Sequence, residues 1–398
     1  MTNAAHHSLL EGAEALLGDV ISLRRRLHAH PELGLHLPAT RSTVLEELAD
    51  LPLTISTGSR TTSVTAVLDS GRPGPTTLLR ADMDALPLTE RTGLPYASTV
   101  EGVMHACGHD AHTAMLIGAA RLLTTRRDAL DGRVIFMFQP GEEGAGGAKI
   151  MLEEGLLQRS GPVDRAFALH VMPLLPSGVI AARPGPTMAS VDTLDVVVTG
   201  QGGHSSMPHT AIDPVPVACE IVMALQSMMT RRLSAFEPAV LTVGSVRAGS
   251  TANVIPSTAT LRLTVRAVSE EARTAILEGV DRVSRNVAAA HLCGVEIETP
   301  DMGYPVTVSD PRLTEHVLET AASVLGDARV ARMPTPVLAG EDWSFVLQQV
   351  PGCLAALGAA PPNVSEPASL HSDEMIVDET AMAAGVALHA AVALSPGH

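Results

Sequence analysis

The sequence predicts an α/β protein whose main domain is interrupted by a smaller inserted one. In residues 1–186 and 300–398, short apolar runs alternate with helical patterns, the order expected of a mostly parallel sheet flanked by helices. Residues 187–299 instead follow the order strand, helix, strand, strand, helix and strand, which is that of a ferredoxin-like unit. A chain of 398 residues is also longer than one typical hydrophobic core supports.

The elements of the main domain follow from periodicity and from turn residues. An amphipathic helix is expected at about 9–28, before a turn at 30–34. Brief apolar runs, as in buried strands, occur at 76–80, 133–138, 165–170 and 353–358, and helical patterns occur at 111–126 and 146–154. Asp110 is expected to cap the helix that starts at 111, and Gly155 to end the later helix.

The inserted domain contains the clearest alternating pattern. Within 258–266, Thr and Arg alternate with Ala, Leu and Val, as in a strand with one buried face. Further strands are expected at 193–199, 239–247 and 295–298, with helices at 213–231 and 269–290. Segments with two prolines each, at 183–186 and 300–305, mark the two boundaries of this domain.

The composition excludes several classes of protein. The formal charge is −16 without a long basic run, so a surface that binds nucleic acid is not expected. No apolar stretch reaches the roughly 18 residues that a membrane span requires. The four cysteines are far apart and the first residues lack the pattern of a signal peptide, which indicates a cytoplasmic protein.

Residue types that bind transition metals follow several of the predicted strands. They are Asp82 and Asp84 after 76–80, Glu142 and Glu143 after 133–138, His170 at the end of 165–170, Cys107 and His109 before a helix, and His371 before the last helix. In an α/β sheet, ligands bind at the carboxyl ends of the strands, and thiol, imidazole and carboxylate groups suit zinc and similar metals. The five side chains that could hold two metal ions with an open position are Cys107, His109, Glu143, His170 and His371.

Each of these residues alone has an ordinary structural explanation. His170 alone would be a hydrogen-bonded core histidine, Cys107 a small buried residue, and the two glutamates a solvated loop. Two other interpretations are rejected. Segment 141–149 is not a phosphate loop, because it lacks Gly-Lys-Ser/Thr, and segment 203–206 is not a serine nucleophile elbow, because it lacks the Gly-x-Ser-x-Gly frame. The joint arrangement, rather than any single residue, indicates a metal site.

Seven segments form a recognisable set. They are 25–34 (RRLHAHPELG), 80–87 (RADMDALP), 104–112 (MHACGHDAH), 138–144 (FQPGEEG), 202–209 (GGHSSMPH), 252–256 (ANVIP) and 340–345 (GEDWSF). With these segments the chain resembles the aminoacylase and carboxypeptidase G superfamily of two-metal peptidases. It is most similar to the branch that holds hippurate hydrolases, bacterial N-acyl-amino-acid amidohydrolases and plant auxin-conjugate hydrolases. Such proteins have a catalytic domain interrupted by a ferredoxin-like domain.

The resemblance implies a role for each residue of the predicted site. The implied ligands of two divalent metal ions are Cys107, His109, Glu143, His170 and His371, with Cys107 possible as a shared ligand. Glu142 corresponds to the general base, and the metals of such proteins are manganese, zinc, nickel or cobalt. Asp82 and Asp84 are expected to support the ligands or, alternatively, to cap their loop. His105 and His112 are expected to be supporting or packing residues.

By the same resemblance, the inserted domain is expected to act as a lid and dimerisation domain. His204 would stabilise the oxyanion, from its own subunit or from the partner in a homodimer or higher homo-oligomer, or else would only anchor the lid. Asn253 and Arg266 match positions that bind the carboxylate of the amino acid product. Arg266 could equally be an exposed strand residue.

The expected activity is metal-dependent hydrolysis of the amide bond of N-acyl or N-aroyl amino acids, with a small-molecule substrate and no nucleic-acid or membrane partner. A dipeptidase or carboxypeptidase on the same scaffold is the alternative, although no dedicated carboxylate for a free amino group is visible. A non-catalytic metal-binding protein is the remaining alternative. It is disfavoured because such a protein would not need Glu142 as a base beside the ligands.

Overall fold

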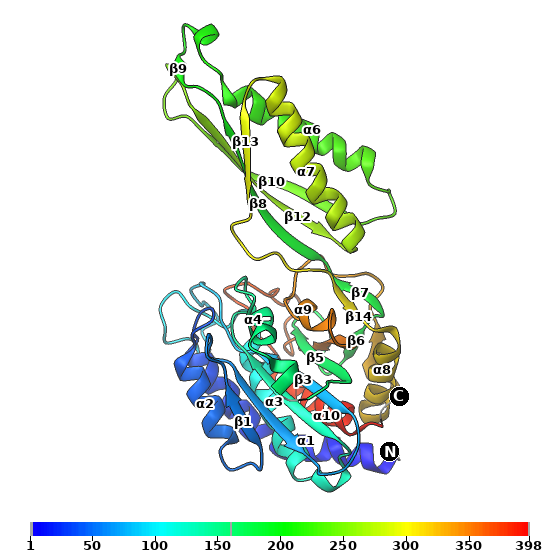
Figure 1. Cartoon of the computed structure of the whole chain (residues 1–398). Helices are drawn as coiled ribbons and strands as arrows, with labels where there is room; N and C mark the ends of the chain where they lie inside the picture. The colour runs from blue at the N-terminus through cyan, green and yellow to red at the C-terminus, as the bar shows by residue number, and fades with distance from the viewer. Residues whose placement is uncertain (1–2, 160, 397–398) are drawn as a thin grey trace. The chain divides into compact units, whose positions relative to one another are not determined.

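The computed structural model describes residues 3–159 and 161–396 and divides the chain into two units (Figure 1). The first unit comprises Met1–Thr187, Val308–Thr335 and Asp342–His398, and the second comprises Met188–Thr307 and Pro336–Glu341. The expected boundaries lay at 186/187 and 299/300. In the structure the chain stays in the second unit up to Thr307 and returns to it for the short segment Pro336–Glu341. Each unit has its own apolar core.

The first unit is built on a sheet of eight strands among the described residues, in the order β1-β2-β4-β3-β5-β16-β6-β15. In that order their bounds are Thr54–Thr57, Val64–Asp69, Arg133–Gln139, Thr76–Asp82, Arg165–Met172, Gly352–Gly358, Ile180–Ala182 and Val330–Arg332. The neighbours β4, β3, β5 and β16 run parallel, whereas β1, β2 and β6 join the sheet antiparallel. Both β3 and β16 are buried at every residue, as expected for strands that are covered on both faces.

Four helices of the first unit pack against one another beside the sheet: α1 (Asn3–Ala29), α3 (His109–Thr124), α8 (Pro311–Leu325) and α10 (Met382–Leu394). Buried along its whole length, α10 is apolar on all sides. Small residues let these helices approach, since a Cβ at Gly118 would lie only 2.9 Å from the side chains of Val20 and Val386. The shorter helices are α2 (Pro38–Leu48), α4 (Gly147–Glu153), α5 (Leu156–Arg159) and α9 (Ser344–Leu347).

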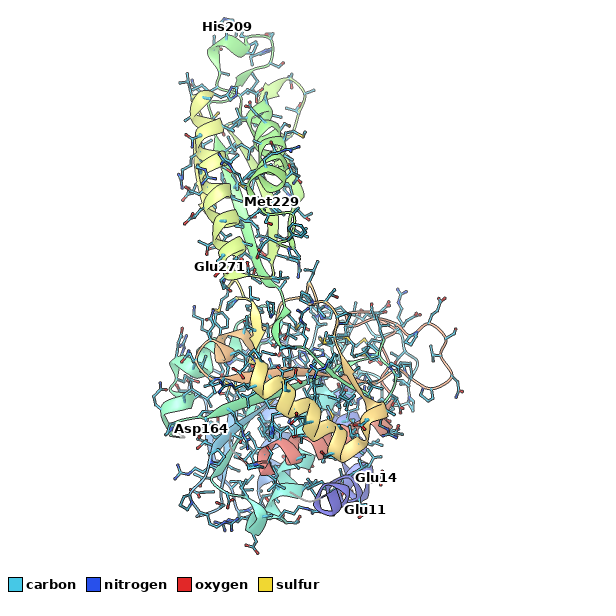
Figure 2. The ribbon with its side chains drawn as sticks, turned by 90° about the vertical axis from the view of Figure 1, so that its right-hand side faces the viewer. Glu11, Glu14, Asp164, His209, Met229 and Glu271 are labelled. Carbon is cyan, nitrogen blue, oxygen red and sulfur yellow. The ribbon has the colours of Figure 1, made fainter. Side chains whose placement is uncertain are left out.

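The second unit contains an antiparallel sheet in the order β10-β12-β8-β13 and two helices that lie side by side (Figure 2). In chain order the elements are β8 (Ser190–Thr199), α6 (Pro214–Arg232), β10 (Ala239–Ala248), β12 (Thr258–Ala267), α7 (Glu270–Ala290) and β13 (Gly294–Glu298). Buried residues alternate along β8 and β12, so that one face of the sheet packs against the helices. This is the ferredoxin-like arrangement, and the predicted fold class is confirmed.

The start of α3 differs from the prediction. Asp110 does not cap this helix, because the helix begins at His109 and is preceded by Gly108 in a left-handed conformation with φ 86°. Asp110 lies in the first turn instead and is buried. Its carboxylate contacts Arg24 and His28 of α1, which are distant in the sequence. The polar partner of Asp110 is therefore another helix and not the backbone of its own.

Several short strands were absent from the prediction. They include β1, β2, β6 and β15 of the large sheet and two pairs of short strands, β9 (Gly203–His204) with β11 (Val254–Ile255) and β7 (Gly185–Met188) with β14 (Thr307–Ser309). Within the part of the chain that the structure describes, none of the helices combines the length and the apolar character that a membrane crossing would need.

Candidate metal centre

The carboxyl ends of the central parallel strands bring the predicted residues to one edge of the sheet. β3 ends at Asp82, which is paired with Gln139, the last residue of β4. Glu142 and Glu143 follow in the loop after β4. On the other side of β3, β5 carries His170 two residues before its end. Because these strands are parallel, their carboxyl ends lie at the same edge.

The turn before α3 places Cys107 at this edge. A Cβ at Gly108 would lie 2.2 Å from the side chain of Val171, so glycine allows the turn to pack directly against β5. Cys107 is buried, and its Sγ lies 3.5 Å from Nε2 of His170. Nδ1 of His170 donates to the carbonyl oxygen of Val171 at 2.7 Å, which leaves the Nε2 lone pair facing Cys107. Burial lowers the pKa of His170 to about 3, so the ring is neutral, as a metal ligand must be.

His109 and Glu143 present buried polar atoms to the same space. Nδ1 of His109 donates to the carbonyl oxygen of Asp84 at 2.8 Å. Nε2 of His109 and Oε1 of Glu143 are 4.0 Å apart, and among the described residues neither atom has a hydrogen-bond partner of standard geometry. Buried polar atoms without a partner are costly. A cation between an imidazole nitrogen and a carboxylate oxygen would satisfy both atoms, so these residues fit a metal ion.

His371 reaches the same place from the C-terminal part of the chain. It has a left-handed backbone with φ 64°, and its N–H donates to the carbonyl oxygen of Ala106 at 2.8 Å. Nε2 of His371 lies 3.2 Å from Oε1 of Glu143, and the side chain is 54% exposed. The nearby carboxylate of Glu143 raises the pKa of His371. The turn before α3 thus holds the backbone of His371 as well as carrying Cys107.

The potential ligand atoms form overlapping groups in which all atoms lie within 4.8 Å of one another. These groups are Cys107, His109 and His170; Cys107, Glu143 and His371; and His109, Glu142 and Glu143. Cys107 belongs to the first two, as a ligand shared by two ions would. Burial opposes a charge on His109, yet the nearby carboxylate of Asp82 raises the pKa of His109 well above its usual value. The surroundings of this ring therefore favour a positive charge, which a bound metal ion would also supply. Burial raises the pKa of Cys107 to about 12, so the thiol must lose its proton when it binds a metal.

Asp84 positions the loop that carries both glutamates. Its Oδ1 accepts the backbone N–H of Glu142 at 2.9 Å, and its Oδ2 accepts that of Glu143 at 3.0 Å. Its own carbonyl oxygen accepts from His109. Asp84 is only 1% exposed and Glu142 only 6%. One aspartate therefore orients an imidazole and fixes the backbone of two carboxylate residues.

Asp82 and His112 bind each other and are held by further contacts within the protein. Nε2 of His112 accepts the backbone N–H of Val171 at 2.8 Å, so the proton is on Nδ1, which donates to Oδ1 of Asp82 at 2.6 Å. Oδ2 of Asp82 contacts Nη1 of Arg80 at 2.6 Å. Asp82, His109 and His112 also have ligand atoms within 4.8 Å of one another. The nitrogens of His112 are nevertheless both engaged, and so are the oxygens of Asp82.

A buried network behind Asp82 was missed by the sequence reasoning. Nε of Arg80 donates to Gln139 at 2.9 Å, and Nη2 of Arg80 lies 3.2 Å from Oδ1 of Asp342. Gln139 donates to Asp342 at 2.8 Å, and Oδ2 of Asp342 accepts the N–H of Ala148 in the first turn of α4. Arg80, Gln139 and Asp342 all lie inside the segments that carry the family resemblance, which was the available signal. The network joins β3 and β4 to the helix that follows the two glutamates.

On the second unit, the structure brings His204 and Asn253 together. His204 ends β9 and is paired with Val254 of β11, and the carbonyl oxygen of Asn253 accepts the N–H of Ser205 at 3.2 Å. Nδ1 of His204 accepts the backbone N–H of Ser206 at 3.1 Å. In the neutral ring the proton is therefore on Nε2, which can donate a hydrogen bond.

Arg266 lies far from this pair of residues within the second unit. It belongs to the C-terminal end of β12, paired with Val191, and its Nη1 donates to the carbonyl oxygen of Leu338 at 2.6 Å. The strand begins at Thr258, and only two residues separate it from β11, which pairs with β9. At about 3.3 Å per residue, some 26 Å of strand separates Thr258 from Arg266. A single second unit does not bring Asn253 and Arg266 to one small molecule.

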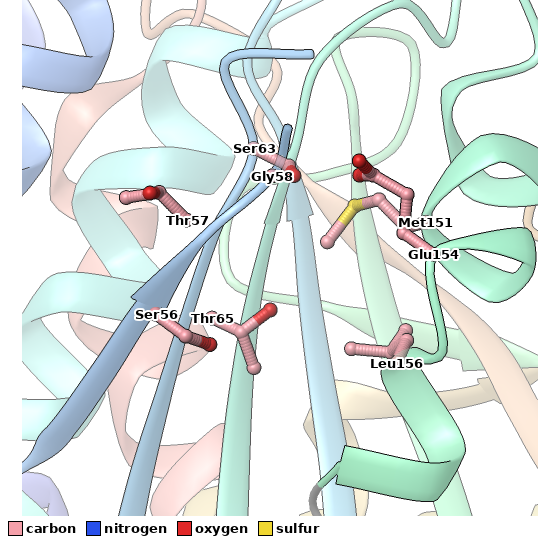
Figure 3. Close-up of a pocket in the computed structure, with 8 residues that line it drawn as sticks. All are labelled: Ser56, Thr57, Gly58, Ser63, Thr65, Met151, Glu154 and Leu156. Atoms are coloured by element: carbon pink, nitrogen blue, oxygen red, sulfur yellow. The ribbon is translucent and has the colours of Figure 1, made fainter. Parts of the chain in front are cut away.

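A separate pocket of the first unit lies between β1, β2 and the end of α4 (Figure 3). Its wall includes Glu154, which anchors the loop after β1. Oε1 of Glu154 accepts the backbone N–H groups of Ser59 and Arg60, each at 2.8 Å, and the hydroxyl of Ser59 at 2.6 Å. These contacts hold a loop in place, and the wall consists of residues other than the predicted ligands.

A family model described as Peptidase family M20/M25/M40 matches residues 78–395, which is most of the chain. The chain belongs to this family. N-acetylcysteine deacetylase of Bacillus subtilis (strain 168) is 39% identical to it over 340 residues, which are 85% of this chain and 88% of that protein. Thermostable carboxypeptidase 2 of Saccharolobus solfataricus is 35% identical over 378 residues, which are 94% of each chain.

A solved structure shows the same fold. The YXEP protein of Bacillus subtilis, described as a dinuclear metal binding peptidase from the M20 family, superposes with a TM-score of 0.82 and 35% identity over 96% of this chain and 98% of that chain. These findings confirm the predicted superfamily and the predicted class of enzyme, a metal-dependent hydrolase.

Proposed function

We propose that this chain hydrolyses the amide bond of N-acyl or N-aroyl amino acids and releases a carboxylic acid and a free amino acid. The observation that carries this proposal is a carboxylate, Glu142, next to five clustered metal-ligand side chains at one edge of the sheet. The name of one relative, N-acetylcysteine deacetylase, describes a reaction of this kind. The name of another, thermostable carboxypeptidase, keeps hydrolysis of peptides as the alternative activity.

The five side chains would hold two divalent metal ions. They are Cys107, His109, Glu143, His170 and His371, and the membership of Cys107 in two groups of ligand atoms supports its role as the shared ligand. Manganese, zinc, nickel and cobalt all suit a thiolate, imidazole and carboxylate set. When bound, such ions polarise the amide carbonyl and lower the pKa of water.

Glu142 would carry the proton of the reaction. As general base it takes a proton from the attacking water, and as general acid it gives that proton to the nitrogen of the leaving amino acid. Its backbone is fixed by Asp84 and its side chain is largely buried, which limits the positions that the carboxylate can take. Asp82 and His112 would hold the strand end and β5 in register around the site.

His204, Asn253 and Arg266 would bind the substrate from the second unit. Nε2 of His204 is the proposed donor to the oxyanion, and Asn253 and Arg266 the proposed partners of the substrate carboxylate. His204 pairs with β11, just before the start of β12, whereas Arg266 lies near the end of β12. Both can therefore contact one small substrate only if they come from two copies of the chain. We therefore propose a homodimer in which the second unit acts as lid and dimerisation domain.

Other features support this proposed assembly and location. β10 is an edge strand of its sheet, and it exposes 42% of Val240 and 54% of Val246. An exposed apolar edge strand is a ready surface for pairing with another chain. The four cysteines are unpaired in the structure, which supports the proposed cytoplasmic location.

The activity is tested with metal-free protein reloaded with Mn²⁺ or Zn²⁺ and assayed against N-acetyl, N-benzoyl and long-chain N-acyl amino acids and against dipeptides. We expect turnover of N-acyl amino acids that is lost on chelation and in Glu142→Gln. The matched control is Glu153→Gln, since Glu153 is a half-exposed carboxylate of α4 that pairs with Arg60. Unchanged turnover after chelation or in Glu142→Gln would contradict the proposal, and faster turnover of dipeptides would favour the alternative.

The assembly is tested by mixing two inactive variants, His204→Ala and Arg266→Ala, after reversible dissociation. If the two residues act across the dimer, a hybrid contains one site with both residues intact. Random mixing then restores up to about a quarter of the wild-type activity, because half of the dimers are hybrids and each has one intact site. If both residues act within one chain, each hybrid site lacks one of them and no activity returns.

A further inference from the structure

A buried polar cluster lies behind the turn that carries Cys107 and His109. Its centre is Asp110, whose Oδ2 lies 2.7 Å from Nε of Arg24 and 2.7 Å from Nδ1 of His28. All three side chains of this cluster are fully buried. Arg24 and His28 lie one turn apart on α1, so one helix contributes both partners of Asp110.

The cluster is held at its outer side by further contacts. Nε2 of His28 lies 3.2 Å from Oε1 of Glu90, and Nη1 of Arg24 lies 3.2 Å from Oε1 of Glu379. The guanidinium of Arg24 also lies over the ring of Tyr96, 5.2 Å from its centre. The side chains of Arg24 and His28 therefore have little freedom to move, and they fix Asp110 relative to α1.

Asp110 is the immediate neighbour of a proposed ligand. It follows His109 directly, and the ring of His105, two residues before Cys107, lies 6.3 Å from the ring of His28. The same turn holds His371 through the carbonyl oxygen of Ala106. The turn thus carries or holds three of the five proposed ligands, and the cluster is joined to it through Asp110.

We propose that Arg24, His28 and Asp110 are positioning residues of the metal site, which fix the turn before α3 and through it the ligand atoms of Cys107 and His109. A buried ion pair contributes little net stability compared with apolar residues of the same volume, so stability alone does not account for this arrangement. Residues behind the ligands that orient them commonly set metal affinity. This inference rests on the proposed metal site.

The test measures metal binding directly and not only activity. Metal-free wild type, Asp110→Asn and a matched control are titrated with Mn²⁺ by calorimetry, and the visible absorption spectrum of each Co²⁺ form is recorded. The control is Asp192→Asn in the second unit, where a buried aspartate forms two 2.8 Å hydrogen bonds with Arg273. It removes a buried charge pair of the same kind in the unit that carries none of the proposed ligands. His109→Ala serves as the variant that lacks a proposed ligand.

We expect Asp110→Asn to bind metal about 10- to 100-fold more weakly, with a changed Co²⁺ spectrum, and Asp192→Asn to match the wild type in both. A folded Asp110→Asn with wild-type affinity and spectrum would overturn the inference. If Asp110→Asn does not fold, His28→Leu takes its place, because it removes only one contact to Asp110. This variant should also bind metal more weakly than the wild type, but by a smaller factor. Wild-type affinity in His28→Leu would likewise overturn the inference. Failure of the wild type itself to bind metal, or unchanged binding in His109→Ala, would instead refute the proposed metal site.

Discussion

Replacement of Asp84 by asparagine should uncouple catalysis from metal binding. Both carboxylate oxygens of Asp84 accept a backbone N–H, one from Glu142 and one from Glu143. Asparagine offers one acceptor oxygen and one NH₂ group. One of the two N–H groups then faces another donor, and the loop has to move away from it.

The size of the effect follows from the bonds that change. A hydrogen bond to a charged group contributes roughly 1.5–3 kcal/mol, and in Asp84→Asn one such bond is lost while the other becomes neutral. A loss of about 2.7 kcal/mol in the transition state corresponds to about 100-fold in rate, which is also the usual effect of moving a catalytic group by about 1 Å. We expect kcat to fall by about that factor. Metal affinity should fall less than kcat, because Glu143 is the only proposed ligand on the displaced loop and Nδ1 of His109 binds the backbone carbonyl oxygen of Asp84, which the substitution leaves in place.

The assay compares kcat and the affinity for Mn²⁺ in wild type, Asp84→Asn and Asp69→Asn. Asp69 is a suitable control because its Oδ1 accepts the backbone N–H of Gly71 at 2.8 Å on an exposed turn. We expect Asp69→Asn to keep the wild-type kcat. A kcat of Asp84→Asn within about threefold of the wild type would refute the reasoning, because the loop would then not depend on the carboxylate. A parallel loss of metal and activity would show that Asp84 acts on the ligands and not on Glu142.

Three further changes probe other parts of the site. Gly108→Ala should lower the free energy of unfolding by at least about 1–2 kcal/mol because of the φ of 86° at this position, and by more because the new Cβ clashes with Val171. In urea unfolding, adding Val171→Ala should recover only the loss that comes from the clash. Burial alone would raise the pKa of Glu90, but hydrogen bonds, including one from His28, lower it to about 2. The ionised carboxylate therefore stabilises the fold above about pH 4.3, and this stabilisation is lost as the pH falls toward 2. Between pH 5 and pH 3, the free energy of unfolding should consequently fall less in Glu90→Gln than in the wild type. Metal at 100 times its Kd should stabilise the metal-free protein by about 2.7 kcal/mol in thermal or urea unfolding, and this gain should vanish in His109→Ala.

Burial explains part of the difference between the strands that were predicted from the sequence and those that were missed. β3 and β16 are buried at every residue and therefore appear as short, continuous apolar runs. β1 and β15 at the edges of the sheet are mostly exposed, so no apolar run marks them. In the second unit, the alternation along β12 reflects one buried face, and here the sequence pattern and the structure agree closely.

The site could be predicted where chain topology alone brings residues together. The ends of β3, β4 and β5 meet because the strands are parallel, which is why Asp82, Glu142, Glu143 and His170 were recognised as neighbours. The local partners could not be predicted in this way. The position of the Asp110 side chain depends on Arg24, which is distant in the sequence. No local sequence pattern distinguishes such a buried aspartate from one that caps a helix.

The contacts of Asp82 explain why a cysteine can stand at the centre of this site. An aspartate at the end of β3 faces the proposed ligands, but its charge is already balanced by Arg80, and its second oxygen is held by His112. Both of its oxygens are therefore already in contact with protein groups. Two divalent ions held mainly by neutral imidazoles would still need anionic ligands, and the structure offers Cys107 and Glu143 at the required place. In the proposed site, a thiolate shared by both ions would supply negative charge in place of Asp82, whose pairs with Arg80 and His112 fix the strands around it.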